Sequence, residues 1–268
     1  MLAGVYQAKK KDGSIYYRSS ITFSNKHISL GSFKTQESAH KAYEKADKIL
    51  KDKSLLLEQL LYEEDILHFE KIVSLANFRD NKIYMKTPIY LHANYFSYYI
   101  SPREEYKFDI DDLFFYSSHK IMKRGGHLFV NEYGMQTNLL SRYGIKNFAV
   151  AGRDYDFANG DSFDYRYSNI IVINQYYGVT AVTKQGNVYY ETQIHINGNY
   201  KIGTYETETQ GAVAYNKAVD LALSHGVKKN FPENYIPELS AKEYTEMYAG
   251  LKISRKYVNY LKTNFGEH

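Results

Sequence analysis

The chain has no cysteine among its 268 residues. Disulfides, thiolate catalysis and cysteine-ligated zinc are therefore excluded, and the fold must be held together by packing. No hydrophobic run approaches the roughly 20 residues that a membrane-spanning helix needs. The start of the chain carries lysines without an adjoining apolar stretch. We therefore expect no membrane segment, no signal peptide and a cytoplasmic protein.

Tryptophan is also absent, whereas tyrosine occurs 29 times. Tyrosine serves buried cores and wet interfaces equally well, so this bias does not assign a role. The net charge of +4 is unevenly distributed, because residues 1–53 hold eleven lysines and arginines against five aspartates and glutamates. Such an excess suits a surface that faces phosphates, or else a solvated lysine-rich face.

The sequence contains an internal repeat, which we name the first repeat (residues 4–50) and the second repeat (residues 178–223). The same pairs of residues recur in the same order: Gly4-Val5 with Gly178-Val179, Tyr16-Tyr17 with Tyr189-Tyr190, Ile21 with Ile194, Gly31 with Gly203, and Ala42-Tyr43 with Ala214-Tyr215. A layout conserved within one chain indicates duplication of a structural unit.

Each repeat is predicted to form three antiparallel strands and a helix. In the first, residues 15–23 alternate, so that one face carries Tyr17, Ser19, Ile21 and Phe23 and the other carries Tyr16, Arg18, Ser20 and Thr22. Thr35 is a predicted helix N-cap, followed by apolar residues at helical spacing. In the second repeat, Thr207 and Gln210 have the spacing of a capping box.

Both repeats resemble the Apetala-type, or ethylene-response-factor-like, DNA-binding domain. The matching elements are the opening Gly-Val, the aromatic second strand ending in Ile, the third strand ending in Leu-Gly-Ser-Phe or Ile-Gly-Thr-Tyr, and the Ala-Tyr of the helix. The resemblance implies a three-stranded sheet that lies in the major groove and a helix that supports its back. Both repeats lack the several arginines and the tryptophans that many relatives place on the DNA-facing side.

The resemblance also implies which residues contact double-stranded DNA. In the first repeat they are Tyr6, Lys10, Arg18, Ser20, Thr22, His27 and Ser29. In the second they are Thr180, Lys184, Glu191, Gln193, His195, Asn199 and Lys201. Arginine suits guanine, glutamine and asparagine suit adenine, and glutamate accepts from cytosine N4. Because the second repeat is slightly acidic, it cannot bind mainly by phosphate attraction, and either reads bases or contacts a protein.

Residues 152–174 resemble the HNH nuclease motif of homing endonucleases. The matching residues are Asp156, Asn159-Gly160-Asp161, Asp164, Arg166 and Asn169. The resemblance implies a ββα-metal core, with Asp156 and Asn169 at metal-ligand positions that suit Mg²⁺. Phe157 stands where the family has its general-base histidine, and Tyr165 where it has asparagine. Because phenylalanine cannot accept a proton, the loss should cost about two to four orders of magnitude in rate.

Other residues near this segment have alternative roles. His119 and His127 are candidates for a base that has migrated, although a histidine there is more often a surface or satisfied core residue. Lys120, Lys123 and Arg124, next to Gly125 and Gly126, suit a phosphate contact or an exposed basic turn.

These patterns predict an α+β protein: two DNA-binding domains, each a three-stranded antiparallel sheet plus a helix, around an HNH-like core, with a small helical tail. The predicted domains are residues 1–53, 54–176, 177–236 and 237–268. The second domain would begin with one leucine-rich helix over 54–76. In the tail, Ser240 and Glu243 predict a capping box, and Ser254 predicts the start of a last helix.

The predicted function is sequence-specific binding of double-stranded DNA by a catalytically inactive transcriptional regulator, derived from a homing endonuclease of a phage or mobile element and associated with the nucleoid. No cofactor is required, and Mg²⁺ would be vestigial. A metal-dependent nicking endonuclease is the first alternative. A protein-interaction scaffold or inhibitor is the second, and RNA is a weaker partner than DNA because no stacking motif is present. A homodimer or a protein partner through the helical tail is a further expectation.

Overall fold

The computed structural model describes residues 2–62 and 66–265. Helices and several small antiparallel sheets are mixed along the chain, in agreement with the predicted α+β class. The chain forms two compact units, one made of residues 1–139 and 157–170 and the other of residues 140–156 and 171–268. Each repeat lies in its own unit. Within the described residues, no helix is both long and apolar enough to cross a membrane.

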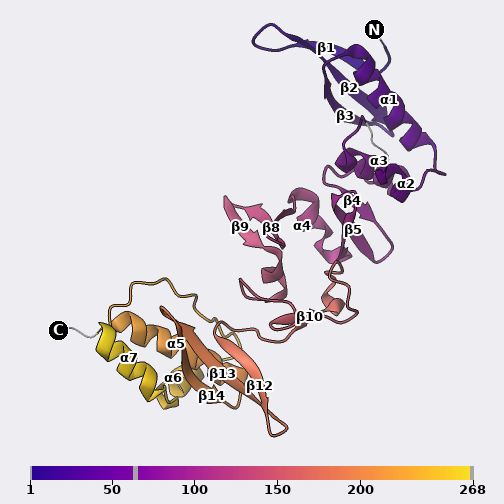
Figure 1. Cartoon of the computed structure of the whole chain (residues 1–268). Helices are drawn as coiled ribbons and strands as arrows, with labels where there is room; N and C mark the ends of the chain where they lie inside the picture. The colour runs from indigo at the N-terminus through magenta and orange to yellow at the C-terminus, as the bar shows by residue number, and fades with distance from the viewer. Residues whose placement is uncertain (1, 63–65, 266–268) are drawn as a thin grey trace. The chain divides into compact units, whose positions relative to one another are not determined.

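The first repeat forms the predicted sheet and helix. Strands β1 (Val5–Lys9), β2 (Ile15–Phe23) and β3 (Lys26–Phe33) pair antiparallel in that order, and α1 (Gln36–Lys51) lies along one face of the sheet (Figure 1). Alternation along β2 places Ile21 in the core and leaves Thr22 exposed. The Thr35 side chain accepts a hydrogen bond from the Ser38 backbone N–H, which confirms the predicted N-cap.

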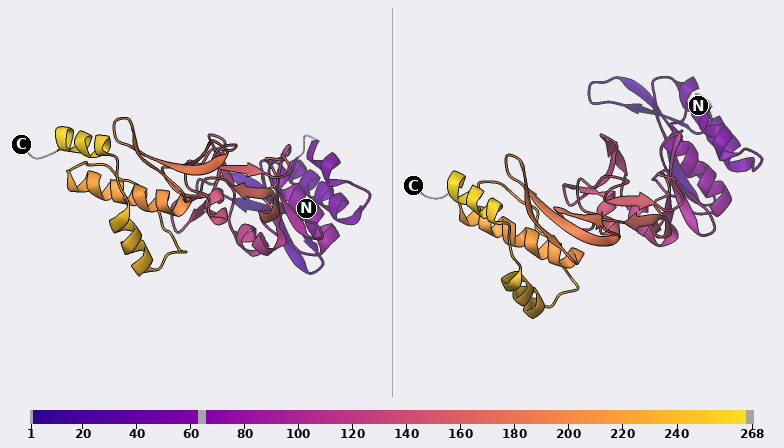
Figure 2. Two further views of the ribbon diagram at one scale, coloured as in Figure 1. Left: turned by 90° about the horizontal axis from the view of Figure 1, so that it is seen from below. Right: turned by 60° about the horizontal axis from the view of Figure 1, so that its bottom comes forward.

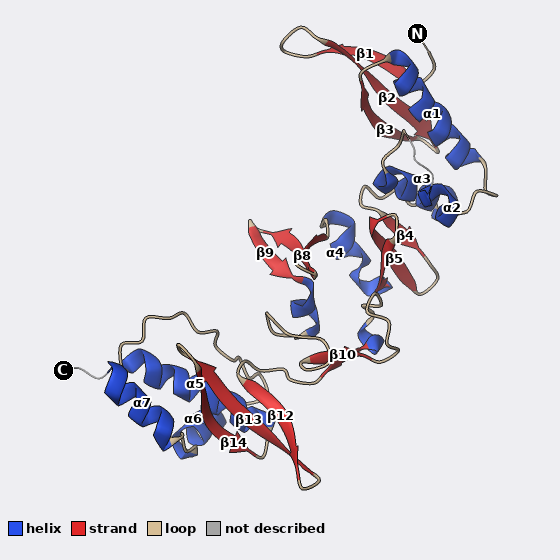
Figure 3. Ribbon diagram, in the orientation of Figure 1, coloured by secondary structure: helices blue, strands red, loops and turns tan. Residues whose placement is uncertain are grey.

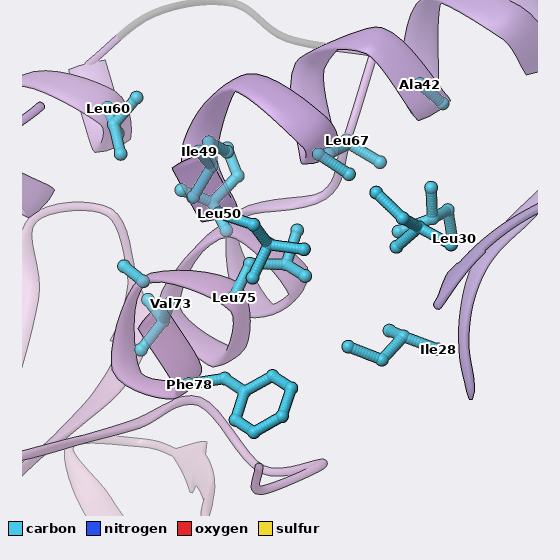
Figure 4. Packing of buried hydrophobic residues seen from close by; sticks show 14 of the residues in the cluster. Ile28, Leu30, Ala42, Ile49, Leu50, Leu60, Leu67, Val73, Leu75 and Phe78 are labelled. Carbon is cyan, nitrogen blue, oxygen red and sulfur yellow. The ribbon is translucent and has the colours of Figure 1, made fainter. Parts of the chain in front are cut away.

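The core of the first repeat continues beyond residue 53. Helices α2 (Leu57–Tyr62) and α3 (Phe69–Asn81) add their apolar side chains to those of the sheet and α1. Figure 4 shows side chains from all of these elements converging on one cluster, including Ile28, Leu30, Ile49, Leu50, Leu60, Val73, Leu75 and Phe78. Helices α2 and α3 therefore share one core with the first repeat.

The prediction of one continuous helix over 54–76 is wrong. His68 has an extended backbone (φ −63°, ψ 141°) and directly precedes α3. Residues 63–65, which the prediction also covers, lie outside the described residues. Because both helices bury leucines against the same core, an unbroken apolar sequence does not require an unbroken helix.

The rest of this unit contains two further antiparallel sheets. One consists of β4 (Ile89–Leu91), β5 (Tyr95–Ser101) and β6 (Glu104–Asp109), and the other of β7 (Met122–Arg124), β8 (His127–Glu132) and β9 (Met135–Asn138). In the sequence, the 3₁₀ turn η1 (Ile110–Asp112) and helix α4 (Leu113–Ser118) lie between these two sheets. The buried rings of Phe96, Phe108 and Tyr116 pack together, with ring centres 4.5 to 5.9 Å apart.

The HNH-like segment crosses from one unit to the other. Strands β10 (Tyr155–Phe157) and β11 (Ile170–Val172) form a two-stranded sheet, and the 3₁₀ turn η3 (Tyr167–Asn169) precedes β11. A further 3₁₀ turn, η2 (Leu139–Tyr143), lies upstream. Residues 157–170 belong to the first unit, where Lys107 of β6 exchanges backbone hydrogen bonds with Phe163 and Tyr165.

The second repeat has the same arrangement. Strands β12 (Val179–Lys184), β13 (Asn187–His195) and β14 (Asn199–Tyr205) pair antiparallel in that order, and α5 (Glu208–Ser224) packs on one face (Figures 2 and 3). The capping box of Thr207 and Gln210 is confirmed. The bulge between Thr192 and Gln193 has its counterpart in the first repeat, between Ser19 and Ser20.

The C-terminal helices complete the core of the second repeat. Helix α6 (Ala241–Gly250) begins with the predicted capping box of Ser240 and Glu243, and α7 (Arg255–Phe265) begins directly after Ser254. Tyr257 and Leu261 of α7 are buried in the same cluster as Ile194. The predicted helices are therefore correct, and this face of α7 is already occupied by the chain itself.

In each repeat, the shared glycine of the Gly-Val pair lies against the shared tyrosine of the Ala-Tyr pair. Gly4 has φ +71°, and a Cβ added there would lie 2.0 Å from the ring of Tyr43. Gly178 has φ +69°, and a Cβ there would lie 2.3 Å from the ring of Tyr215. The Gly-Val and Ala-Tyr pairs thus recur because the glycine leaves room for the tyrosine while adopting a left-handed backbone.

Candidate nucleic-acid interface

In each repeat the helix covers one face of the sheet, and the opposite face carries polar side chains. We name these the first outer face, on β1–β3, and the second outer face, on β12–β14. Cross-strand pairing defines them, because partners point to the same side. On the first, Arg18 pairs with Tyr6 and Ser32, and Thr22 with His27. On the second, Glu191 pairs with Thr180 and Thr204, and His195 with Asn199.

The structure exposes most of the predicted contact residues of the first repeat. Those on the outer face that are exposed are Tyr6, Arg18, Thr22, His27 and Ser29. Lys10 is exposed in the turn between β1 and β2, where its N–H donates to the Ser14 carbonyl at 2.9 Å. Ser20 differs, because it is only 8% exposed although its partner Ser29 on β3 is exposed. Ser20 follows the bulge in the sheet, and its backbone N–H donates to the Gly4 carbonyl at 3.0 Å. The Ser20 side chain is therefore buried at this irregular point of the sheet.

Arg18 is the main positive group at the centre of the first outer face. Its Nη2 donates to the Tyr16 hydroxyl at 2.8 Å, and its guanidinium lies 5.6 Å from the centre of the Tyr16 ring. Within the part of the chain that the structure describes, Arg18 has no carboxylate partner. A guanidinium oriented by a neighbouring tyrosine and left uncompensated is suited to guanine O6 and N7 or to a phosphate.

The second outer face carries a charge-paired network. Lys201 forms an ion pair with Glu191, and Gln193 Nε2 donates to Glu191 Oε1 at 2.8 Å. The Lys201 ammonium, assisted by Gln193, holds the pKa of Glu191 below its ordinary value. Beside this network, His195 Nδ1 and Asn199 Oδ1 are 2.8 Å apart. Lys184 is exposed at the end of β12.

A cavity of about 600 Å³ adjoins the second outer face within its unit. Its lining combines residues of the outer face, Glu191, Gln193, His195 and Asn199, with Lys146, Phe148, Arg153 and Lys229 from outside the sheet. Burial by itself would raise the pKa of Asp154. Its ion pairs with Arg153 (2.6 Å) and Lys146 (2.9 Å) have the larger effect, so the pKa of the Asp154 carboxyl is lowered. Sequence reasoning missed Lys146, Arg153 and Lys229, because none of them belongs to the repeated pattern.

The HNH-like turn is held together by its own polar side chains. Asp164 is fully buried and bonds Arg166 at 2.5 Å and the Asn159 amide at 3.0 Å. Asn169 Oδ1 accepts the Asn159 N–H at 2.8 Å, and its Nδ2 donates to the Asp164 carbonyl at 2.8 Å. The Phe157 ring packs on Tyr165, with ring centres 5.7 Å apart. These contacts give the motif residues a structural role in closing the turn.

The two predicted metal-ligand residues lie at the β10–β11 pairing. Asp156 is in β10 and Asn169 directly precedes β11, and the Asn169 carboxamide is engaged in the turn. Among the described residues, no group of three or more histidines, aspartates and glutamates is placed to hold a metal ion.

The remaining candidates lie around the β7–β8 hairpin. His119 stacks on Phe115, with ring centres 4.1 Å apart, and its Nδ1 lies 2.8 Å from the Phe115 carbonyl. His127 is exposed opposite Arg124, whose guanidinium lies 5.8 Å from the Phe129 ring. Lys123 and Lys120 are each paired with a glutamate, Glu104 and Glu70. Arg124 is thus better placed than either lysine for a phosphate contact.

Comparison with protein-family models, with curated proteins and with solved structures finds no match to this chain. The two repeats therefore provide the comparison themselves. They share strand order, bulge, helix placement and the glycine–tyrosine contact, whereas their outer faces differ.

Proposed function

We propose that this protein binds double-stranded DNA in a sequence-specific manner through the two outer faces, and acts as a regulator by occupying its site. The observation that carries the proposal is the duplicated sheet, which twice buries one face under a helix and leaves a polar face exposed. A short antiparallel sheet is narrow enough to enter the major groove, where each base pair presents a distinct set of donors and acceptors.

The two repeats have different roles in this proposal. The first supplies electrostatic attraction, because residues 1–53 are strongly basic and Lys10 is exposed in the β1–β2 turn. The second has little net charge to offer and contributes contacts to base edges. Because both repeats are on one chain, binding by one raises the effective concentration of the other.

The HNH-like segment is proposed to maintain structure, as a remnant of a homing endonuclease. HNH chemistry needs an imidazole to deprotonate the attacking water, and Phe157 has no proton acceptor. Asn169, at a family metal-ligand position, bonds backbone groups of the turn. The chain passes from one unit to the other twice within this segment, after residue 156 and after residue 170.

Selection from a random duplex library tests the proposal. The full chain, immobilised at moderate salt, is expected to enrich one motif, and gel shifts on that motif should show tighter binding than on shuffled DNA. Failure to enrich any motif would contradict the proposal and favour a protein-interaction scaffold.

A plasmid assay separates the regulator from a nicking endonuclease. Supercoiled plasmid carrying the selected motif is incubated with the protein and Mg²⁺ or Mn²⁺, and we expect no accumulation of nicked circles. Nicking that disappears in the Asp156→Ala variant would show that the segment is catalytic after all.

A further inference from the structure

Residues of opposite charge occupy the same position on the two outer faces. Arg18 in β2 and Glu191 in β13 each lie between one residue of the first strand and one of the third. Arginine at this position is easily explained in a DNA-binding protein. Glutamate at this position needs an explanation, because a carboxylate near the phosphates lowers the affinity for DNA unless a hydrogen bond from a base compensates for it.

Contacts with Lys201 and Gln193 orient Glu191 and favour its ionised form. Lys201 contacts Oε2 and Gln193 donates to Oε1, so both carboxylate oxygens are held. The Glu191 side chain is 22% exposed and that of Lys201 is 49% exposed, so the pair remains accessible from outside. The second outer face therefore presents an acceptor and a donor side by side.

This pair is complementary to one kind of base pair. A C·G pair presents the cytosine N4 amino group next to guanine O6, with guanine N7 beyond it. Cytosine N4 and guanine O6 share a hydrogen bond, so they lie about 2.9 Å apart, close to the separation of the charged atoms in an ion pair. An A·T pair also offers a donor beside an acceptor, but it lacks two adjacent acceptors and adds the thymine methyl group.

We propose that Glu191 and Lys201 act together to select one C·G base pair, with Glu191 accepting from cytosine N4 and Lys201 donating to guanine O6 and N7. The inference rests on the proposed DNA-binding function and adds its specificity. Because Arg18 has no such carboxylate partner among the described residues, the two repeats recognise unlike half-sites. The target sequence is therefore not a palindrome.

Parallel selections with the wild-type chain and with Glu191→Gln test the inference. The wild type should enrich a motif with a C·G pair that Glu191→Gln no longer requires, with a loss of preference on the order of tenfold at that position only. Glu191→Gln should also bind random duplexes more tightly, because a negative charge is removed. Lys201→Gln should lose the same preference but bind all duplexes more weakly.

Glu246→Gln is the matched control, because Glu246 also pairs with a lysine, Lys242, but lies exposed on α6, outside the second outer face. It should leave the motif unchanged, and circular dichroism should show that every variant is folded. If wild type and Glu191→Gln enrich the same motif with equal preference at every position, the inference is overturned while DNA binding stands. If the wild type enriches no motif, the proposed function fails and the inference falls with it.

Discussion

At the scale of single residues, the repeats keep the side chains that pack and change the ones that are exposed. Gly178 illustrates the first group, because it combines a left-handed backbone with close contact to the ring of Tyr215. The same glycine and tyrosine recur in the first repeat as Gly4 and Tyr43. A recurring glycine in this chain is thus evidence of tertiary contact as well as of a turn.

Gly178→Ala is expected to destabilise its unit by about 2 to 4 kcal/mol, from backbone strain together with clashes of the added Cβ against the Tyr215 ring (2.3 Å) and the Gln193 backbone carbonyl (2.4 Å). Gly186→Ala is the matched control, because Gly186 has φ +83° but no neighbour within 4 Å of an added Cβ. It should cost only about 1 kcal/mol. Urea unfolding curves measure both, and equal losses would contradict the role assigned to the tyrosine contact.

A second comparison between the repeats concerns a buried hydroxyl group that has a hydrogen-bond partner in one repeat and none in the other. Thr192 Oγ1 donates to the Gly211 carbonyl at 3.1 Å, whereas the buried hydroxyl of the equivalent Ser19 has no partner within the described residues. Thr192→Val should cost about 1 kcal/mol, whereas Ser19→Ala should be neutral or slightly stabilising. Thermal unfolding would contradict this account if Ser19→Ala were the more damaging change.

At the scale of elements, the β1–β2 hairpin carries two residues that are proposed to contact DNA in different ways. Lys10→Ala, in the turn, should weaken binding to all sequences alike and reduce the slope of log affinity against log salt by about one. Arg18→Ala, on the outer face, should weaken binding and also relax the preference at one position. Gel shifts at several salt concentrations distinguish them, and equal losses on selected and random DNA for Arg18→Ala would contradict its assignment to a base.

Local signals predicted the ends of helices better than their continuity. The caps at Thr35, Thr207 and Ser240 were predictable, because capping depends on side chains within a few residues of the helix start. The break between α2 and α3 was not predictable from periodicity, because leucines continue through it. It depends on how both helices pack against the core of the first repeat.

At the scale of the whole molecule, each unit contains a buried aspartate that is paired with basic side chains, Asp164 with one and Asp154 with two. Asp164 in the first unit pairs with Arg166, and Asp154 in the second pairs with Lys146 and Arg153. In both, burial raises the pKa but the cations outweigh it, so the folded-state pKa lies below the ordinary value. A lowered pKa contributes stability that is present above the unfolded pKa of about 3.9 and is lost as the pH falls through the folded value.

Both units should therefore lose stability in acid below about pH 4. Asp164→Asn should lower the unfolding transition of the first unit at neutral pH by about 1.5 to 3 kcal/mol and flatten its acid dependence. Asp154→Asn should do the same in the second unit. Calorimetry at several pH values measures both, with exposed Asp111→Asn as the control that should change neither transition.

The sequence by itself determined the duplication, the sheet-plus-helix plan of each repeat and the side of each sheet that is exposed. These follow from alternation, turns and caps, which depend on near neighbours. Tertiary structure alone decided that α3 and α7 complete the cores of the repeats and that Ser20 is buried. It also decided that Glu191 is paired with Lys201, which lies on the adjacent strand. These outcomes depend on contacts between residues distant in sequence, which periodicity does not encode.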